Sequence, residues 1–171
     1  MTNPLLIEIF ALANSVIDKA VKANKTIGTA ESCTGGLLGA AITSISGASS
    51  VFKGGITAYD NAVKSDVLGV DKAAIEANGA VSEEVAKAMA IGALKQLNVD
   101  MALSVTGIAG PSGGTAQKPV GTIWLGLAQI QGEHIEVFTH RLDLGDIGRN
   151  RIRDVSVLEA LKLFDQTLSA T

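Results

Sequence analysis

Cysteine, histidine and aromatic residues are scarce in this chain, and each scarcity excludes a class of protein. The 171 residues include one cysteine, two histidines and 4 % aromatic residues. A single cysteine cannot form an intrachain disulfide, which fits a reducing compartment, so we expect a cytoplasmic protein. Zinc held by Cys and His is not expected, because Cys33, His134 and His140 are the only such side chains.

Charged residues are also few. Asp, Glu, Lys and Arg make up 18 % of the chain, and the formal net charge is −3. Because nucleic-acid binding rests on neutralising phosphates, a mildly acidic chain is not expected to bind nucleic acid. The N-terminus lacks the basic start of a signal peptide. The uncharged stretch 32–52 is rich in Gly, Ser and Thr, so we expect turns and a helix there and no membrane span.

Aliphatic and small residues are abundant instead. Apolar residues make up 47 % of the chain, and 19 residues are glycine. This length and composition predict one domain over residues 1–171, with a core of Ala, Val, Ile and Leu and closely approaching backbones.

Hydrophobic periodicity and capping residues divide the chain into helices and strands. Helices are expected at 5–23, 34–45, 61–68, 71–77, 82–97 and 149–168. Strands are expected at 26–31, 51–58, 100–106, 120–130 and 133–142, the last two joined as a hairpin at Gln131-Gly132. This order predicts an α/β fold, a single layered α/β/α domain with a mixed sheet.

Ser32 lies where the strand 26–31 meets the next helix. Unpaired N–H groups at a helix start favour negative charge, so the position suits a nucleophile whose reaction generates an oxyanion. Ser32 or Thr34 as a simple helix N-cap explains the same pattern. Cys33 is a competing nucleophile, but no histidine lies in a suitable neighbourhood to act as its base.

Tyr59 and Lys64 follow the strand 51–58 closely enough to reach one edge of the sheet. A desolvated lysine with a lowered pKa can take the proton of a serine nucleophile, so no histidine is required. A solvated Lys64 and a Tyr59 that plugs the strand end also explain the pattern.

Glycines and arginines suggest where an anion binds. The loop 107–119 follows a buried strand, and its glycines let backbone N–H groups approach a ligand. The loop matches neither standard nucleotide fingerprint, and we expect no cofactor. Arg149 and Arg153 share a helix face that suits phosphate, although salt bridges to surface carboxylates would explain them equally.

Five motifs in order resemble the CinA C-terminal domain family, the PncC-type nicotinamide-nucleotide amidohydrolases. The similarity is collinear over roughly residues 5–168. The motifs are Ala30 to Gly36, Tyr59-x-Asn61-x-x-Lys64, Gly79 to Ser82, Val105 to Pro111 and Lys118 to Thr122.

The resemblance implies hydrolysis of nicotinamide mononucleotide to nicotinic acid mononucleotide and ammonia. It implies that Ser32 is the nucleophile, Lys64 the general base and Tyr59 an assisting or positioning group, with no metal. It also implies a small-molecule substrate and favours a homodimer or larger assembly.

For this reaction we expect backbone donors and arginines to bind the substrate. The expected substrate-binding residues are Cys33, Thr34, Gly35 and Thr106 at the oxyanion, and Gly107, Gly110, Arg149 and Arg153 at the ribose phosphate.

One segment departs from the family pattern. Many members read Gly-Asp-Arg where this chain has Gly145-Asp146-Ile147-Gly148-Arg149, with two extra residues. The insertion leaves open how Asp146 is placed and whether Arg149 or Arg151 meets the ligand. Two other functions stay open: a non-catalytic, competence- or DNA-damage-associated nucleotide-binding regulator, and an amidase for a related pyridine or nucleoside amide.

Overall fold

The computed structural model describes residues 3–169 and has a five-stranded mixed sheet at its centre. The strand order is β2-β1-β3-β4-β5. β1 pairs in parallel with both β2 and β3, whereas β4 pairs antiparallel with both β3 and β5. The strands are β1 (Ile27–Glu31), β2 (Phe52–Thr57), β3 (Met101–Gly107), β4 (Thr122–Gln131) and β5 (His134–Asp143).

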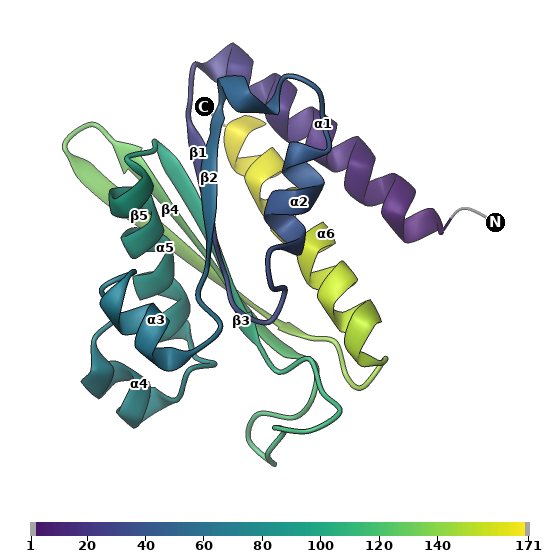
Figure 1. Ribbon diagram of the computed structural model, residues 1–171, viewed down its shortest axis with the longest axis vertical. Coiled ribbons are helices and arrows are strands. Elements are labelled where there is room, and N and C mark those ends of the chain that lie inside the picture. The colour runs from purple at the N-terminus through teal and green to yellow at the C-terminus, as the bar shows by residue number, and fades with distance from the viewer. Residues whose placement is uncertain (1–2, 170–171) are drawn as a thin grey trace.

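Helices cover both faces of the sheet (Figure 1). One face carries α1 (Pro4–Ala23), α2 (Leu37–Thr43) and α6 (Arg149–Ser169). The other carries α3 (Asn61–Asp66), α4 (Lys72–Asn78) and α5 (Glu83–Leu97), and a short 3-10 helix spans Ala48–Ser50. The predicted layered α/β fold with a mixed sheet is confirmed. None of the helices within residues 3–169 is long and apolar enough to cross a membrane.

Alternate residues of β3 face two separate cores, because neighbouring side chains of a strand point to opposite faces. Leu103 and Val105 join the core beneath α1, α2 and α6, whereas Ala102 joins the core beneath α5. The α5 side uses small residues because the helix approaches closely: a Cβ at Gly126 of β4 would lie 2.5 Å from the Ala86 carbonyl oxygen.

The helix after β1 starts later than predicted. The expected helix 34–45 is wrong at both ends, since α2 begins at Leu37 and ends at Thr43. Residues 33–36 form a turn in which Gly35 and Gly36 have φ angles of 62° and 96°, a region that other residues rarely adopt. Ser32 therefore ends a strand and enters a tight turn rather than a helix.

Parallel pairing brings the candidate residues to one edge. Strands β2, β1 and β3 are neighbours and run in the same direction, so their carboxyl ends lie side by side. Ser32 follows β1, Tyr59 follows β2 and Gly107 ends β3. Ligand sites of α/β folds lie at this edge.

We expect Gly92→Ala to destabilise the fold and Gly39→Ala not to. A Cβ at Gly92 of α5 would lie 2.0 Å from the Leu68 carbonyl oxygen, whereas one at Gly39 of α2 would meet nothing closer than 3.5 Å. Overpacking should lower the free energy of unfolding of Gly92→Ala by about 1–3 kcal/mol, measured by urea denaturation. Equal stability of the two variants would contradict this packing.

Candidate active site

The amine of Lys64 contacts the hydroxyl of Ser32. Lys64 Nζ lies 3.0 Å from Ser32 Oγ. It also donates to the carbonyl oxygens of Ala58 at 2.9 Å and Tyr59 at 3.1 Å. The lysine reaches back because Asp60 caps α3 through a hydrogen bond from the Ala62 N–H, which places Lys64 one turn into the helix.

Lys64 is buried, with 1 % of its surface exposed. Burial lowers the pKa of Lys64 because it penalises the charged form, and the nearby charge of Asp60 opposes this shift in part. The predicted desolvated lysine is thus present beside Ser32, and the alternative of a solvated Lys64 is wrong.

A polar cavity of about 190 Å³ opens next to this pair. Its walls come from the ends of all three parallel strands and from α3 and α6. The lining residues are Ser32, Cys33, Tyr59, Asn61, Lys64, Ala80, Val81, Thr106, Gly107, Ala109 and Arg149.

Glu31 occupies the start of α2. Its buried carboxylate accepts hydrogen bonds from the N–H groups of Gly36, Leu38 and Gly39 at 2.8–3.0 Å. A carboxylate is favourable there because the helix start carries unpaired donors and partial positive charge. The expectation that these helix-start donors face Ser32 is therefore wrong, since Glu31 takes three of them. Sequence reasoning gave Glu31 no role, although an acid directly before the turn was visible.

Arg153 binds the backbone of the turn that follows Ser32. Its Nε donates to the Cys33 carbonyl at 3.1 Å and its NH2 group donates to the Thr34 carbonyl at 3.0 Å. Arg153 does not line the polar cavity. The expected phosphate contact at Arg153 is not supported, because its guanidinium is engaged by the backbone.

Arg149 lies at the mouth of the cavity. Its NH1 group donates to the Gly110 carbonyl at 2.8 Å, and its NH2 group donates to the Tyr59 hydroxyl at 3.3 Å. Arg151 is exposed and does not line the cavity, so of the arginines left open by the insertion, Arg149 faces it. Asp146 is exposed and accepts from the Gly148 N–H.

Tyr59 contributes its backbone more than its ring. Its carbonyl orients Lys64, while its side chain is 63 % exposed. The alternative of Tyr59 as a plug at the strand end is therefore wrong. Asn61, which sequence reasoning quoted without a role, lines the cavity beside it.

Of the other residues predicted to bind the substrate, Thr106 and Gly35 are engaged within the protein, whereas Gly107 lines the cavity. The hydroxyl of Thr106 donates to the Ala80 carbonyl at 2.9 Å, so its one proton is committed and it holds the wall of the cavity. The Gly35 N–H donates to the Ser32 carbonyl, which removes it from the expected oxyanion donors. Gly107 lines the cavity, and a Cβ there would lie 2.2 Å from Ile123 Cδ1.

Cys33 is an unfavourable nucleophile. The thiol is buried, and burial raises its pKa to about 12, with the charge of Glu31 acting in the same direction. A thiolate is the reactive form of cysteine, so little of it exists near neutral pH. Both histidines are exposed on the edge strand β5.

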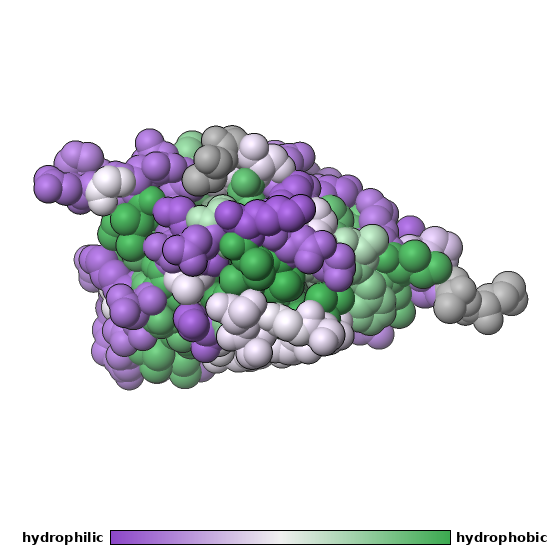
Figure 2. Space-filling view, turned by 90° about the horizontal axis from the view of Figure 1, so that it is seen from above, coloured by the Kyte–Doolittle hydropathy of each residue, from purple (hydrophilic) through white to green (hydrophobic). Residues whose placement is uncertain are grey.

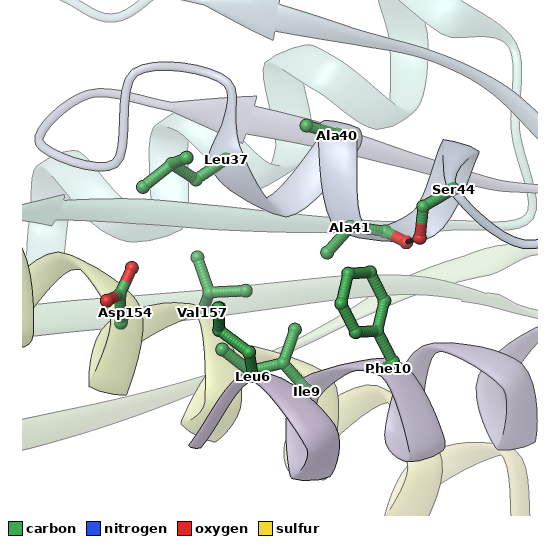
Figure 3. A pocket seen from close by; sticks show the side chains of 9 residues that line it. All are labelled: Leu6, Ile9, Phe10, Leu37, Ala40, Ala41, Ser44, Asp154 and Val157. Atoms are coloured by element: carbon green, nitrogen blue, oxygen red, sulfur yellow. Dashed lines mark hydrogen bonds between the residues drawn. The ribbon is translucent and has the colours of Figure 1, made fainter. Parts of the chain in front are cut away.

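A second cavity is apolar and lacks a catalytic pair. This groove of about 210 Å³ lies between α1, α2 and α6, with Leu6 and Phe10 among its walls (Figure 3). The Ser44 hydroxyl in it donates to the Ala41 carbonyl, and the other ionisable or hydroxyl side chain is Asp154. Hydrophobic residues reach the surface at the N-terminal end of α1, where Leu6, Ile7 and Phe10 are exposed (Figure 2). The polar cavity at Ser32 is therefore the candidate active site.

Comparison with known proteins agrees with the fold and with the family resemblance. Residues 9–168 match the model of the CinA C-terminal domain. A CinA-like protein of Rippkaea orientalis is 48 % identical over 137 residues, which are 80 % of this chain and 32 % of that protein. The chain thus spans about a third of the length of the curated relatives it matches.

Solved structures share the whole fold. The competence/damage inducible protein CihA from Agrobacterium tumefaciens is 41 % identical, with a TM-score of 0.89 over 95 % of this chain and 96 % of that one. A CinA superfamily protein from Klebsiella pneumoniae is 26 % identical, with a TM-score of 0.88 over 95 % and 99 % of the two chains.

We expect the Cys33 thiol to resist alkylation in the folded protein. At pH 8, iodoacetamide should modify it at least about 100-fold more slowly than in denaturant, because the folded thiol is buried and its pKa is about 12. The rate is followed by mass spectrometry. Equal rates in the folded and unfolded states would contradict the burial and leave a cysteine nucleophile open.

Proposed function

The chain belongs to the CinA C-terminal domain family, and from this premise we propose that it is a serine amidohydrolase acting on the carboxamide of nicotinamide mononucleotide. The products would be nicotinic acid mononucleotide and ammonia. The observation that carries the proposal is the 3.0 Å contact between the buried amine of Lys64 and the hydroxyl of Ser32.

The hydrogen bonds of Lys64 suit a general base. A neutral amine has two N–H donors and one lone pair. The carbonyls of Ala58 and Tyr59 take the two donors, which turns the lone pair toward Ser32 Oγ. Burial lowers the pKa of Lys64 and so favours this neutral form.

The reaction would then follow acyl-transfer chemistry. Ser32 Oγ bonds to the carboxamide carbon while its proton passes to Lys64. The resulting oxyanion would be stabilised by a backbone N–H of the turn that is not already bonded, and Lys64 returns the proton to the amide nitrogen as the carbon–nitrogen bond breaks. Water then attacks the acyl carbon while one of its protons passes to Lys64, and Lys64 returns that proton to Ser32 Oγ as the acyl–oxygen bond breaks. The acid product loses its remaining proton to solvent and leaves as a carboxylate, with Ser32 free again.

Arg149 supports an anionic substrate. Its guanidinium lies at the cavity mouth beside the Gly110 carbonyl, on the glycine-rich loop. A guanidinium matches phosphate through paired hydrogen bonds. The ribose phosphate would therefore bind at the rim, with the carboxamide at Ser32.

We expect the wild type to release ammonia from nicotinamide mononucleotide, with EDTA present, and Ser32→Ala to lose at least about 10³-fold in kcat. Ser49→Ala, at an exposed serine away from the cavity, is the matched control and should keep wild-type activity. Ammonia is measured by a coupled assay. No release by a folded wild type would overturn the proposed substrate, and full activity of Ser32→Ala would overturn the nucleophile.

Lys64→Met should lose about 10²–10⁴-fold in kcat, since it removes the base. It should also be more stable than the wild type near neutral pH. The pKa of Lys64 is lower in the folded state than its ordinary 10.5, so unfolding takes up a proton between the two values and the wild type gains stability as the pH rises toward 10.5.

The stability advantage of Lys64→Met over the wild type should therefore shrink as the pH approaches 10.5. Urea denaturation at several pH values measures it, with the exposed Lys87→Met as the matched control. A difference between Lys64→Met and wild type that does not change with pH would show that Lys64 is not desolvated.

A further inference from the structure

The backbone carbonyls of Ser32, Cys33 and Thr34 are occupied. The Ser32 carbonyl accepts the N–H of Gly35 at 3.1 Å. The next two carbonyls, of Cys33 and Thr34, accept the Nε and NH2 groups of Arg153. One guanidinium thus fixes two consecutive peptide groups.

Fixing a carbonyl also fixes the N–H of the same peptide group. A trans peptide is planar, and its C=O and N–H point in opposite directions. Arg153 binds the Cys33 carbonyl, so the N–H of Thr34 points away from the guanidinium. In the same way, the turn bond from Gly35 to the Ser32 carbonyl fixes the direction of the Cys33 N–H.

The Cys33 N–H faces its own thiol, so the Thr34 N–H is the donor still available. Within residues 3–169, neither the Cys33 nor the Thr34 N–H donates to a carbonyl or carboxylate oxygen. The later donors of the segment are used, because Glu31 accepts from Gly36, Leu38 and Gly39.

We propose that Arg153 is a positioning residue, which aims the N–H group of Thr34 at the oxyanion formed when Ser32 attacks its substrate. The proposal rests on the proposed acyl-transfer function. It replaces the expectation that Arg153 binds the phosphate, since a guanidinium that holds two carbonyls outside the cavity acts through the backbone.

Arg149 and Arg153 therefore have different tasks although they lie one helical turn apart on α6. Arg149 lines the cavity mouth and has a donor facing the Tyr59 hydroxyl. Arg153 packs so closely on the turn that a Cβ at Gly35 would lie 3.4 Å from its NH2 group. Loss of Arg153 should reduce the rate of the chemical step, and loss of Arg149 should reduce binding of the phosphate.

The test compares two substrates that differ only in the phosphate, nicotinamide mononucleotide and nicotinamide riboside. Arg153→Gln should lower kcat by about 10²-fold on both substrates and leave KM within about threefold, as for loss of an oxyanion donor. Arg153→Lys, which can still donate to one carbonyl, should recover part of the loss. Arg149→Gln should raise KM for the mononucleotide alone.

Arg141→Gln is the matched control. Arg141 pairs with Asp143 on the exposed strand β5, and the variant should behave as wild type on both substrates. An Arg153→Gln variant that raises KM for the mononucleotide only would overturn the proposal and make Arg153 a phosphate ligand. Unchanged kinetics on both substrates would overturn it as well.

A fluorophosphonate probe separates this proposal from the choice of substrate. Ser32 Oγ bonds to phosphorus, fluoride leaves, and the serine proton passes to Lys64. The step needs the nucleophile and the oxyanion donors but no pyridine nucleotide. The rate constant for labelling of Ser32 is measured by mass spectrometry, and Arg153→Gln should lower it by about 10²-fold.

The outcomes are distinct. If the wild type is labelled at Ser32 but releases no ammonia, the proposed substrate is wrong, and slower labelling of Arg153→Gln still supports the positioning role. Equal labelling of wild type and Arg153→Gln overturns that role. Thermal unfolding identifies any variant that does not fold. If Arg153→Gln does not fold, Arg153→Lys is compared with the wild type instead. A labelling rate of Arg153→Lys equal to that of the wild type then counts against the proposal.

Discussion

The site depends on one buried amine. Lys64 has 1 % of its surface exposed, and its Nζ meets two carbonyls and the Ser32 hydroxyl. Burying an amine costs free energy, and the pKa of Lys64 falls because the neutral form costs less. The two carbonyls accept its donors, so the group is desolvated without being left unpaired. The fold tolerates this cost at the point where a base is useful.

The sheet makes that arrangement possible. Three neighbouring parallel strands end at one edge, so residues far apart in sequence meet there without long loops. Small residues on the α5 side let the helix layer lie close, while Glu31 and Arg153 fix the turn between β1 and α2 from its two ends. Ser32 is thereby followed by a turn in which the carbonyls of Ser32, Cys33 and Thr34 and the N–H groups of Gly35 and Gly36 already have partners.

The sequence predicted the strands and the layered fold, because hydrophobic periodicity is a local property. The residues alone left the pairing of Ser32 with Lys64 open, and the family resemblance implied it. Sequence reasoning failed where side chains compete for the same backbone. A helix start beside Ser32 looked free, yet Glu31 fills it. Arg149 and Arg153 looked equivalent at four residues apart, yet the turn 33–34 takes only Arg153. Such competition depends on where side chains lie in the folded structure, and the spacing of residues in the sequence does not determine that.

The burial of Lys64 also bears on how a product would leave the proposed active site. The proposed reaction turns an uncharged amide into a carboxylate at the inner end of the cavity. A protonated lysine there would hold that new anion in an ion pair, and burial, which lowers the pKa of Lys64, disfavours this charged form. Glu31, buried directly behind the turn, adds negative potential on the same side. In the proposed reaction, the feature that prepares the attack would thus also favour departure of the acid.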